Sequence, residues 1–163
     1  MLKAEMKLNN VNVRQIPNIC RIETFAGDGN GEPMNAVPFP DGTTFSSIAF
    51  AASDLEKSED KEWAVFYVPE NLQGEIENQG GNKSDAAPTN ALVVDVTAEI
   101  GGEKYLYAAY PGGNSLNNFN IQRNQVYRMT LTITGEKGQN NPSSNCFVVK
   151  PNGFLSFEPY YRV

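Results

Sequence analysis

The stretch at residues 118–135, NFNIQRNQVYRMTLTITG, decides the fold that this sequence predicts. Apolar side chains recur at every second position from Tyr127 onward, and an arginine and threonines fill the positions between them. Successive side chains of a β-strand point to opposite faces of its sheet, so the pattern predicts a strand with one buried and one solvated face. Threonine is β-branched and suits a pleated, solvated surface. Gly135 ends the pattern and is expected to end the strand.

The rest of the chain repeats this plan of short alternating segments separated by Gly-, Pro- and Asn-rich turns. The clearest segment, residues 92–100, should form a tight hairpin through Gly101–Gly102 with a strand at residues 103–110. Residues 2–13 change the parity of their apolar positions at Asn9–Asn10, as a β-bulge or a bend would require. Further strands are expected at residues 20–25, 43–51, 62–68, 145–150 and 154–157.

Residues 62–68 carry apolar side chains on both faces, which indicates an interior strand or one that is covered on both sides. Trp63 shares its parity with Val65 and Tyr67, and we expect it in the core. Pro69 should end the pairing because it has no N–H group to donate.

Composition places the chain among ordinary globular proteins. It has 163 residues, of which 40% are hydrophobic and 20% are charged, so one domain spanning residues 1–163 can bury a core. No long helix or internal repeat is evident, and many short strands predict an all-β, antiparallel sandwich. The net charge of −6 argues against binding to nucleic acid or to an anionic membrane surface. No apolar run approaches the roughly 20 residues of a membrane helix.

The residue types argue against metal, cofactor and enzyme chemistry. The chain has no histidine, which excludes Ser-His-Asp and Cys-His nucleophile systems and His-containing zinc sites. Residues 28–32, DGNGE, open like a calcium loop, but Pro33 and Phe39 stand where that loop needs glycine and glutamate. We therefore expect no catalytic residues, no cofactor and no metal site. Cys20 and Cys146 either form one disulfide in an exported protein or are two small buried hydrophobes.

Three motifs resemble those of the fimbrillins, the pilus subunits of gut and oral Gram-negative anaerobes. They are YVPENLQG at residues 67–74, the stretch at residues 118–135, and SNCFVV at residues 144–149. The resemblance implies a Greek-key, transthyretin-like β-sandwich in an exported lipoprotein at the outer membrane or in a fimbrium. The N-terminus lacks a signal core, so the leader is expected to be absent from this chain. Fimbrillins commonly have two such domains, so this chain is expected to be one domain, and it could be a fragment of a longer subunit.

The resemblance also implies a function. It favours a structural or adhesive subunit of a fimbria-like assembly, joined to other pilus or surface-protein subunits by β-strand addition. The expected exchangeable strands are the two ends, residues 2–13 and 154–163, the latter within a C-terminal segment at residues 144–163. The alternative is that both ends pair within the chain. A different class of function also stays open, a glycan-binding module of a surface lipoprotein, with host or microbial glycans or proteins as partners.

Four residues are candidate ligand or assembly contacts. Arg123 could bind an acidic ligand, or it could pair with a local carboxylate and backbone carbonyls. Asn124 is expected in a turn, since asparagine tolerates positive φ. Tyr160 and Tyr161 are expected to be exposed, where aromatic rings can stack on sugars. Glu70 is the most tempting catalytic acid, but its expected role is to bond backbone amides in the turn after Pro69.

Overall fold

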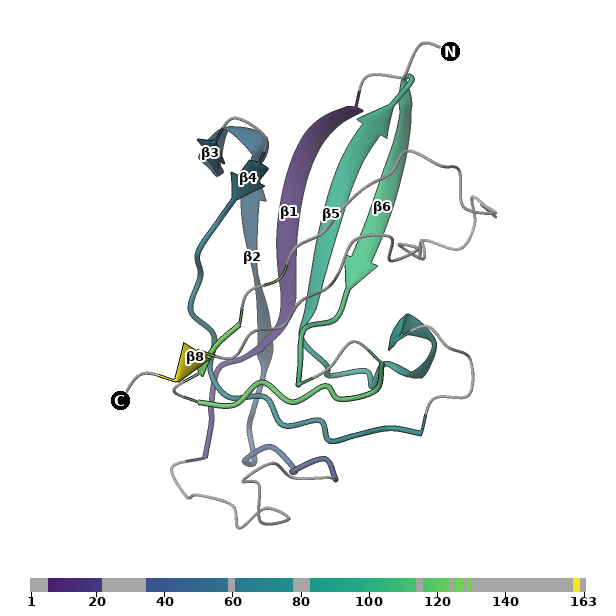
Figure 1. Cartoon of the computed structure of the whole chain (residues 1–163). Helices are drawn as coiled ribbons and strands as arrows, with labels where there is room; N and C mark the ends of the chain where they lie inside the picture. The colour runs from purple at the N-terminus through teal and green to yellow at the C-terminus, as the bar shows by residue number, and fades with distance from the viewer. Residues whose placement is uncertain are drawn as a thin grey trace.

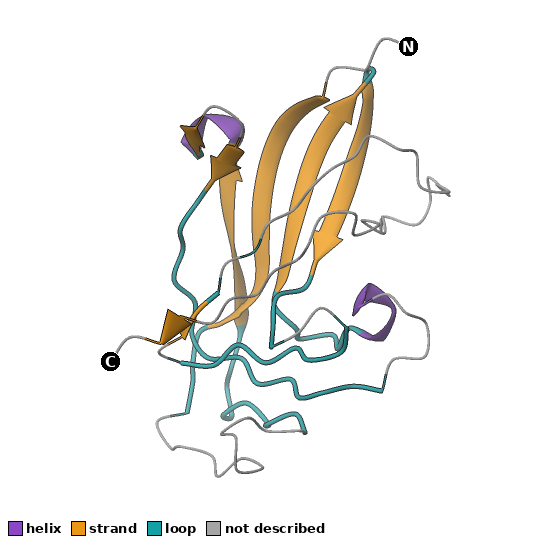
Figure 2. Ribbon diagram, viewed as in Figure 1, coloured by secondary structure: helices purple, strands orange, loops and turns teal. Residues whose placement is uncertain are grey.

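The computed structural model describes residues 6–21, 35–58, 61–77, 83–113, 116–123, 125–127, 129 and 160–161. Within these residues the chain forms antiparallel β-strands and two short 3₁₀-helices, η1 (Ala52–Asp54) and η2 (Lys83–Ala86). The predicted all-β class is therefore confirmed (Figure 2). The predicted strands at residues 145–150 and 154–157 lie outside the described residues, as does most of residues 127–134.

The main sheet has four strands in the order β2-β1-β5-β6. They are β1 (Met6–Pro17), β2 (Phe45–Ala51), β5 (Val93–Ile100) and β6 (Glu103–Ala109). Every neighbouring pair is antiparallel. The N-terminal strand β1 therefore lies inside the sheet, between β2 and β5, rather than at an edge (Figure 1).

Strand β1 contains the bulge that its parity change predicts. Leu8 pairs with Ala98 of β5, but Asn10 pairs with Thr97, so Asn9 is the additional residue. A second irregularity falls between Val13 and Ile16 on the β2 side, next to Gln15 with its φ of 62°. The two bulges allow the apolar side chains of one long strand to stay on the same face of the sheet.

The predicted hairpin between β5 and β6 is confirmed. Ile100 pairs with Glu103, and Gly101 and Gly102 form the turn with φ values of 60° and 87°. A two-residue turn with positive φ at both positions matches the right-handed twist of its strands, and glycine adopts this conformation without steric cost. Strand β6 ends at Ala109, one residue before the predicted end.

One face of the main sheet carries the hydrophobic core. Val13 pairs with Val94 and Val11 pairs with Val96, so the apolar positions of adjacent strands share this face. The opposite face carries polar groups, among them the ion pair of Arg14 and Asp95. The buried residues of the core cluster are Val13, Ile16, Leu92, Val94, Val96, Ala98, Tyr107 and Ile121.

Extended segments outside the main sheet pack on this apolar face. Phe66 and Val68 come from one segment, and Tyr127 and Met129 come from another. Tyr127 and Met129 are two of the alternating apolar residues from which the sequence predicted a buried strand face within residues 118–135. Of the described residues in that stretch, Gln125–Val126 form strand β7, and β7 pairs with β8 (Tyr160–Tyr161).

The prediction of a strand over residues 62–68 is wrong beyond Trp63. Among the described residues, strand β4 (Lys61–Trp63) pairs with β3 (Glu56–Ser58) alone, and the chain leaves the ladder after Trp63. Trp63 is 46% exposed, so its expected place in the core is also wrong. The physical reason is that the alternate positions, occupied by Phe66 and Val68, cover the sheet. Trp63 and the side chains of its parity consequently face solvent.

Candidate functional site

The two motifs that carry the strongest resemblance lie side by side. Asn71 and Ile121 exchange two backbone hydrogen bonds of 2.8 Å. The N–H of Phe119 donates to the carbonyl of Gly74 over 3.0 Å, which extends the antiparallel contact. Residues 70–76 and 117–123 therefore form one junction, which we call the motif junction. Sequence alone could not show this pairing, because the bonded residues are far apart in the chain.

An ion pair between Glu70 and Arg123 closes one end of the motif junction. Nη2 of Arg123 lies 2.6 Å from Oε1 of Glu70, and Nε lies 2.9 Å from Oε2. The backbone N–H of Arg123 also donates to Oε2, over 3.3 Å. The Glu70 side chain is 11% exposed, so a largely buried carboxylate accepts a two-point contact from a guanidinium. Its hydrogen bonds to Glu70 raise the pKa of Arg123 above the ordinary value.

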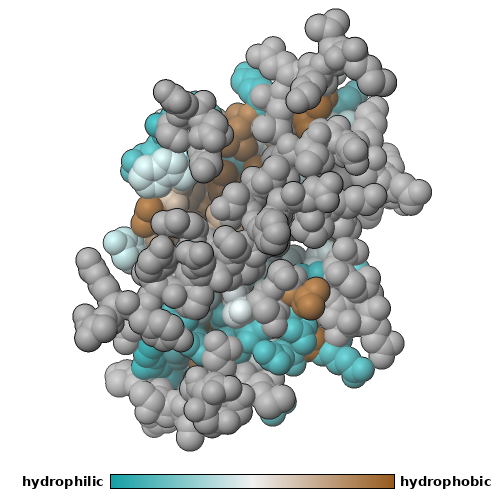
Figure 3. Space-filling model, in the orientation of Figure 1, coloured by the Kyte–Doolittle hydropathy of each residue, from teal (hydrophilic) through white to brown (hydrophobic). Residues whose placement is uncertain are grey.

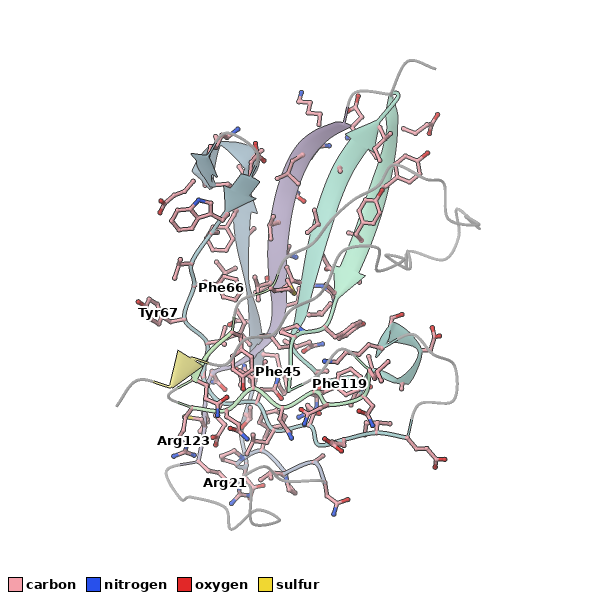
Figure 4. The ribbon with its side chains drawn as sticks, in the orientation of Figure 1. Arg21, Phe45, Phe66, Tyr67, Phe119 and Arg123 are labelled. Carbon is pink, nitrogen blue, oxygen red and sulfur yellow. The ribbon has the colours of Figure 1, made fainter. Side chains whose placement is uncertain are left out.

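Arg123 also connects the motif junction to the chain that follows β1. Its Nη2 donates to the carbonyl oxygen of Arg21 over 2.6 Å, and Figure 4 shows Arg123 and Arg21 near one another below the sheet. Of the two roles expected for Arg123, the structure shows the contact with a carboxylate and a carbonyl. Glu70 is distant in sequence rather than local, and the amide that it bonds belongs to Arg123 rather than to the Pro69 turn.

Buried asparagine side chains complete the motif junction where its ladder is irregular. Oδ1 of Asn120 accepts the N–H of Gly74 over 2.7 Å. Oδ1 of Asn118 accepts the N–H groups of Gly113 and Asn120, each over 3.0 Å, and its Nδ2 donates to Glu75 over 3.0 Å. Both asparagines are buried, so these bonds satisfy backbone groups that have no water to bond. In the sequence, the only signal for these two residues is that Asn118 and Asn120 are two positions apart. That spacing does not show which backbone groups they bond.

Asn71 of the YVPENLQG motif ties the motif junction to the main sheet. Its Nδ2 donates to the carbonyl of Asn90 over 2.8 Å and to that of Gln15 in β1 over 3.3 Å. The side chain is buried, so both carbonyls gain a partner away from solvent. The side chains of Glu70, Asn71 and Arg123 thus hold an irregular segment in place through these hydrogen bonds.

A shallow hollow beside the ion pair is too small for a ligand pocket. Its cavity volume is about 20 Å³, whereas pockets for drug-sized ligands have roughly 300–1,000 Å³. This volume is enough for about one water molecule. The hollow is lined by Cys20, Arg21, Val37, Pro38, Phe39, Pro40, Glu70 and Leu72.

Cys20 is exposed with a free thiol, so the expectation of burial is wrong for this residue. Cys146 lies outside the described residues. In the part of the chain that the structure describes, no three His, Cys, Asp or Glu side chains are grouped to hold a metal ion. No helix within those same residues is long and apolar enough to cross a membrane.

The remaining candidate contacts are Asn124, Tyr160 and Tyr161. Asn124 is outside the described residues. The backbone of Tyr160 pairs with Val126, and that of Tyr161 pairs with Gln125, which places β8 beside β7 (Figure 1). The side chains of both tyrosines are outside the described part, so their exposure stays a prediction.

An exposed row, which sequence reasoning placed in the core, begins at the last residue of β4 and continues along the segment that follows. Trp63, Val65 and Tyr67 are 46%, 66% and 92% exposed. In Figure 4, Tyr67 points away from the protein while its neighbour Phe66 points toward the sheet. Figure 3 shows brown and pale surface on this side of the molecule, near β2 and β4. We call its two aromatic residues, Trp63 and Tyr67, the exposed aromatic row.

A family model described as Domain of unknown function (DUF4906) matches residues 66–131. The matched region is less than half of the chain, and it contains both halves of the motif junction. No curated protein and no solved structure matches the chain.

Proposed function

We propose that this chain is a fimbrillin-like subunit, or one domain of such a subunit, in a fimbria-like assembly at the cell surface. Its fold would be a Greek-key, transthyretin-like β-sandwich of which the four-stranded sheet is one layer. The proposal rests on the motif junction. There, two segments that resemble fimbrillin motifs follow the expected order along the chain and are joined by backbone hydrogen bonds. In this account the protein is exported to the cell surface.

The position of β1 carries the proposed mechanism of assembly, β-strand addition. Strand β1 comes from the N-terminal end of the chain, yet it pairs with β5 over residues 6–14 and with β2 over residues 10–17. Val13 and Ile16 of β1 are buried in the core. A strand near a chain end can leave or join a sheet without unthreading the rest of the domain. Withdrawal of β1 would expose two unpaired edges and an apolar slot, which is the kind of site that another strand fills.

The C-terminal end is the proposed donor to that slot in a neighbouring subunit. Within residues 154–163, FLSFEPYYRV, the apolar residues Leu155, Phe157, Tyr161 and Val163 share one parity, and the other parity carries Ser156, Glu158 and Arg162 together with Phe154 and Tyr160. This alternation suits a strand with one buried face. The described part of this end pairs with its own chain only through the two residues of β8.

Strand complementation tests the proposal. A chain lacking residues 1–17 is mixed with a peptide of residues 154–163, with a peptide of residues 2–17, or with a scrambled peptide. Thermal shift and native mass report binding. The proposal requires the first two peptides, but not the scrambled one, to bind and stabilise the shortened chain. Stabilisation by residues 2–17 alone would show a replaceable strand without head-to-tail assembly, and it would contradict the proposal.

Glycan binding is the second candidate function, and the exposed aromatic row favours it. Trp63 and Tyr67 are four positions apart on an extended segment, which separates them by roughly 13 Å. Exposed, rigid aromatic rings offer flat apolar surface beside polar groups, which suits the faces of sugar rings. A glycan array with the full chain tests this function. Ligands that are lost in Trp63→Ala and Tyr67→Ala, but kept in the exposed control Leu116→Ala, would support it.

A further inference from the structure

Strand β2 forms one edge of the main sheet, and its outer side is open within the described residues (Figure 1). Its ladder pairs it with β1 alone among those residues. The segment after β4 contacts β2 through the rings of Phe66 and Phe50, but in the described chain no backbone hydrogen bond joins the two. Five of the seven residues of β2 are exposed. The strand therefore presents backbone N–H and C=O groups to solvent, as an open edge does.

Two hydrogen bonds at the ends of β2 show which of its residues face outward. The carbonyl of Thr44, just before the strand, accepts the N–H of Asn18 on the β1 side over 3.0 Å. At the other end the N–H of Ala51 donates to a carboxylate of η1 over 2.9 Å, and so points away from β1. Because alternate residues of an antiparallel strand bond opposite neighbours, the N–H and C=O groups of Ser47 and Ala49 also face outward.

The side chains of β2 do not protect this edge. Natural sheets guard their edges with charged residues, proline, short strands or a covering segment. The opposite edge, β6, begins with Glu103 and Lys104, whereas β2 reads FSSIAFA and has neither charge nor proline. Ile48 in the middle of β2 is 37% exposed, although it lies on the apolar face and pairs with the fully buried Val13. The edge thus combines outward backbone groups with an incompletely covered apolar side chain.

We propose that β2 is an interface between two copies of this chain, paired antiparallel around a twofold axis at Ile48. In this register the outward groups of Ser47 meet those of Ala49 in the second copy, and the reverse, so one set of residues supplies both sides of a symmetric contact. The two Ile48 residues form a pair without hydrogen bonds, where opposed side chains approach most closely. The two four-stranded sheets then become one continuous sheet.

The charge of the chain favours a second copy at this edge. Each chain carries a net charge of −6, so two copies repel each other wherever acidic surfaces are opposed. The seven uncharged residues of β2 provide a stretch where two backbones approach without opposed like charges. A strongly charged partner would find no complementary group on this strand. Pairing with a copy also covers the exposed part of both Ile48 side chains.

This interface is separate from the strand addition proposed above, which uses residues 1–17 and 154–163. It needs β1 in place, because β1 holds β2 in the sheet. The full chain therefore tests this interface, whereas the assembly is tested on a chain that lacks residues 1–17. Failure of either proposal is thus distinguishable from failure of the other.

Sedimentation velocity of the full chain over a concentration series tests the proposal. Wild type should form a dimer of the 17.9 kDa chain. Ile48→Lys places two ammonium groups at the axis and should weaken dimerisation about 100-fold, whereas Leu116→Lys, at another exposed apolar residue, should not. Ala49→Pro removes an outward N–H but no bond to β1, so it should give a folded monomer, as a thermal melt would show.

A covalent trap tests the register. In a chain with both native cysteines replaced by serine, Ile48→Cys should oxidise to a disulfide-linked dimer much faster than Leu116→Cys, because opposed residues at the axis lie within disulfide reach. Equal rates would contradict the register. A wild type that stays monomeric at every concentration would overturn the proposal and leave the edge to a different partner. A dimer that persists in both Ile48→Lys and Ala49→Pro would overturn it too, because the copies would then associate through another surface.

Discussion

Replacing Gly112 by alanine should strongly destabilise the protein through a collision between two backbone segments. Gly112 has a φ of 153°, and its added Cβ would lie 2.0 Å from the carbonyl oxygen of Asn118 and 2.9 Å from the carbonyl carbon. An ordinary carbon–oxygen contact is at least 3.4 Å, so the two segments must separate by more than 1 Å. Neither atom belongs to a flexible side chain that could turn aside.

The magnitude follows from what this separation breaks. A non-glycine residue at this φ costs about 1–3 kcal/mol. Movement of Asn118 also breaks its 3.0 Å bond from the N–H of Gly113, a loss of about 1 kcal/mol, and opens the packing around Phe119. We expect Gly112→Ala to lower the free energy of unfolding by about 3–5 kcal/mol. In a chain of this size that corresponds to a fall in Tm of roughly 10 °C.

Gly42→Ala provides the matched control. Gly42 also has a positive φ, of 79°, but its Cβ would meet nothing within 4 Å. Only the conformational cost of about 1–2 kcal/mol remains. Urea unfolding followed by tryptophan fluorescence, with thermal melts, measures both variants. Equal losses in the two variants would refute the close approach of Gly112 and Asn118.

Three further predictions follow from the same geometry. Glu70→Gln and Arg123→Met should each lower the free energy of unfolding, because each single change leaves a charge without its partner. The double variant should lose clearly less than the sum of the two single losses. Additive losses in urea unfolding would show that the ion pair contributes nothing. Asn120→Ala should cost about 1–3 kcal/mol because it leaves a buried backbone N–H unpaired, and a change within 0.5 kcal/mol by the same assay would contradict this role. In a Cys146→Ser variant, native Cys20 should react with a thiol reagent as fast as in the denatured chain, whereas strong protection in native mass spectra would contradict its exposure.

The parts of the fold that sequence predicts well depend on local signals. The hairpin of β5 and β6 follows from strict alternation around Gly101–Gly102, and the bulge at Asn9 follows from a change of parity within β1. Residues 62–68 lacked such a signal, because both of their faces are apolar. Only the packing of Phe66 on the sheet decides which face is inside.

The candidate site was less predictable because its contacts are distant in sequence. Glu70 and Arg123 are separated by 53 positions, and Gly74 and Asn120 by 46. Sequence reasoning identified Glu70, Arg123 and the motifs around them, and it allowed that both groups serve structure. It could not pair them, because residue type and spacing do not show which segments of an irregular layer are adjacent.

The most direct test of the proposed assembly is sedimentation velocity of a chain that lacks residues 1–17. The account predicts head-to-tail oligomers, in which residues 154–163 of one copy fill the slot left by β1 in the next. A second chain that lacks both ends should form no such oligomers. If the chain without residues 1–17 stays monomeric, or if oligomers persist after residues 154–163 are also removed, strand addition through these ends is contradicted.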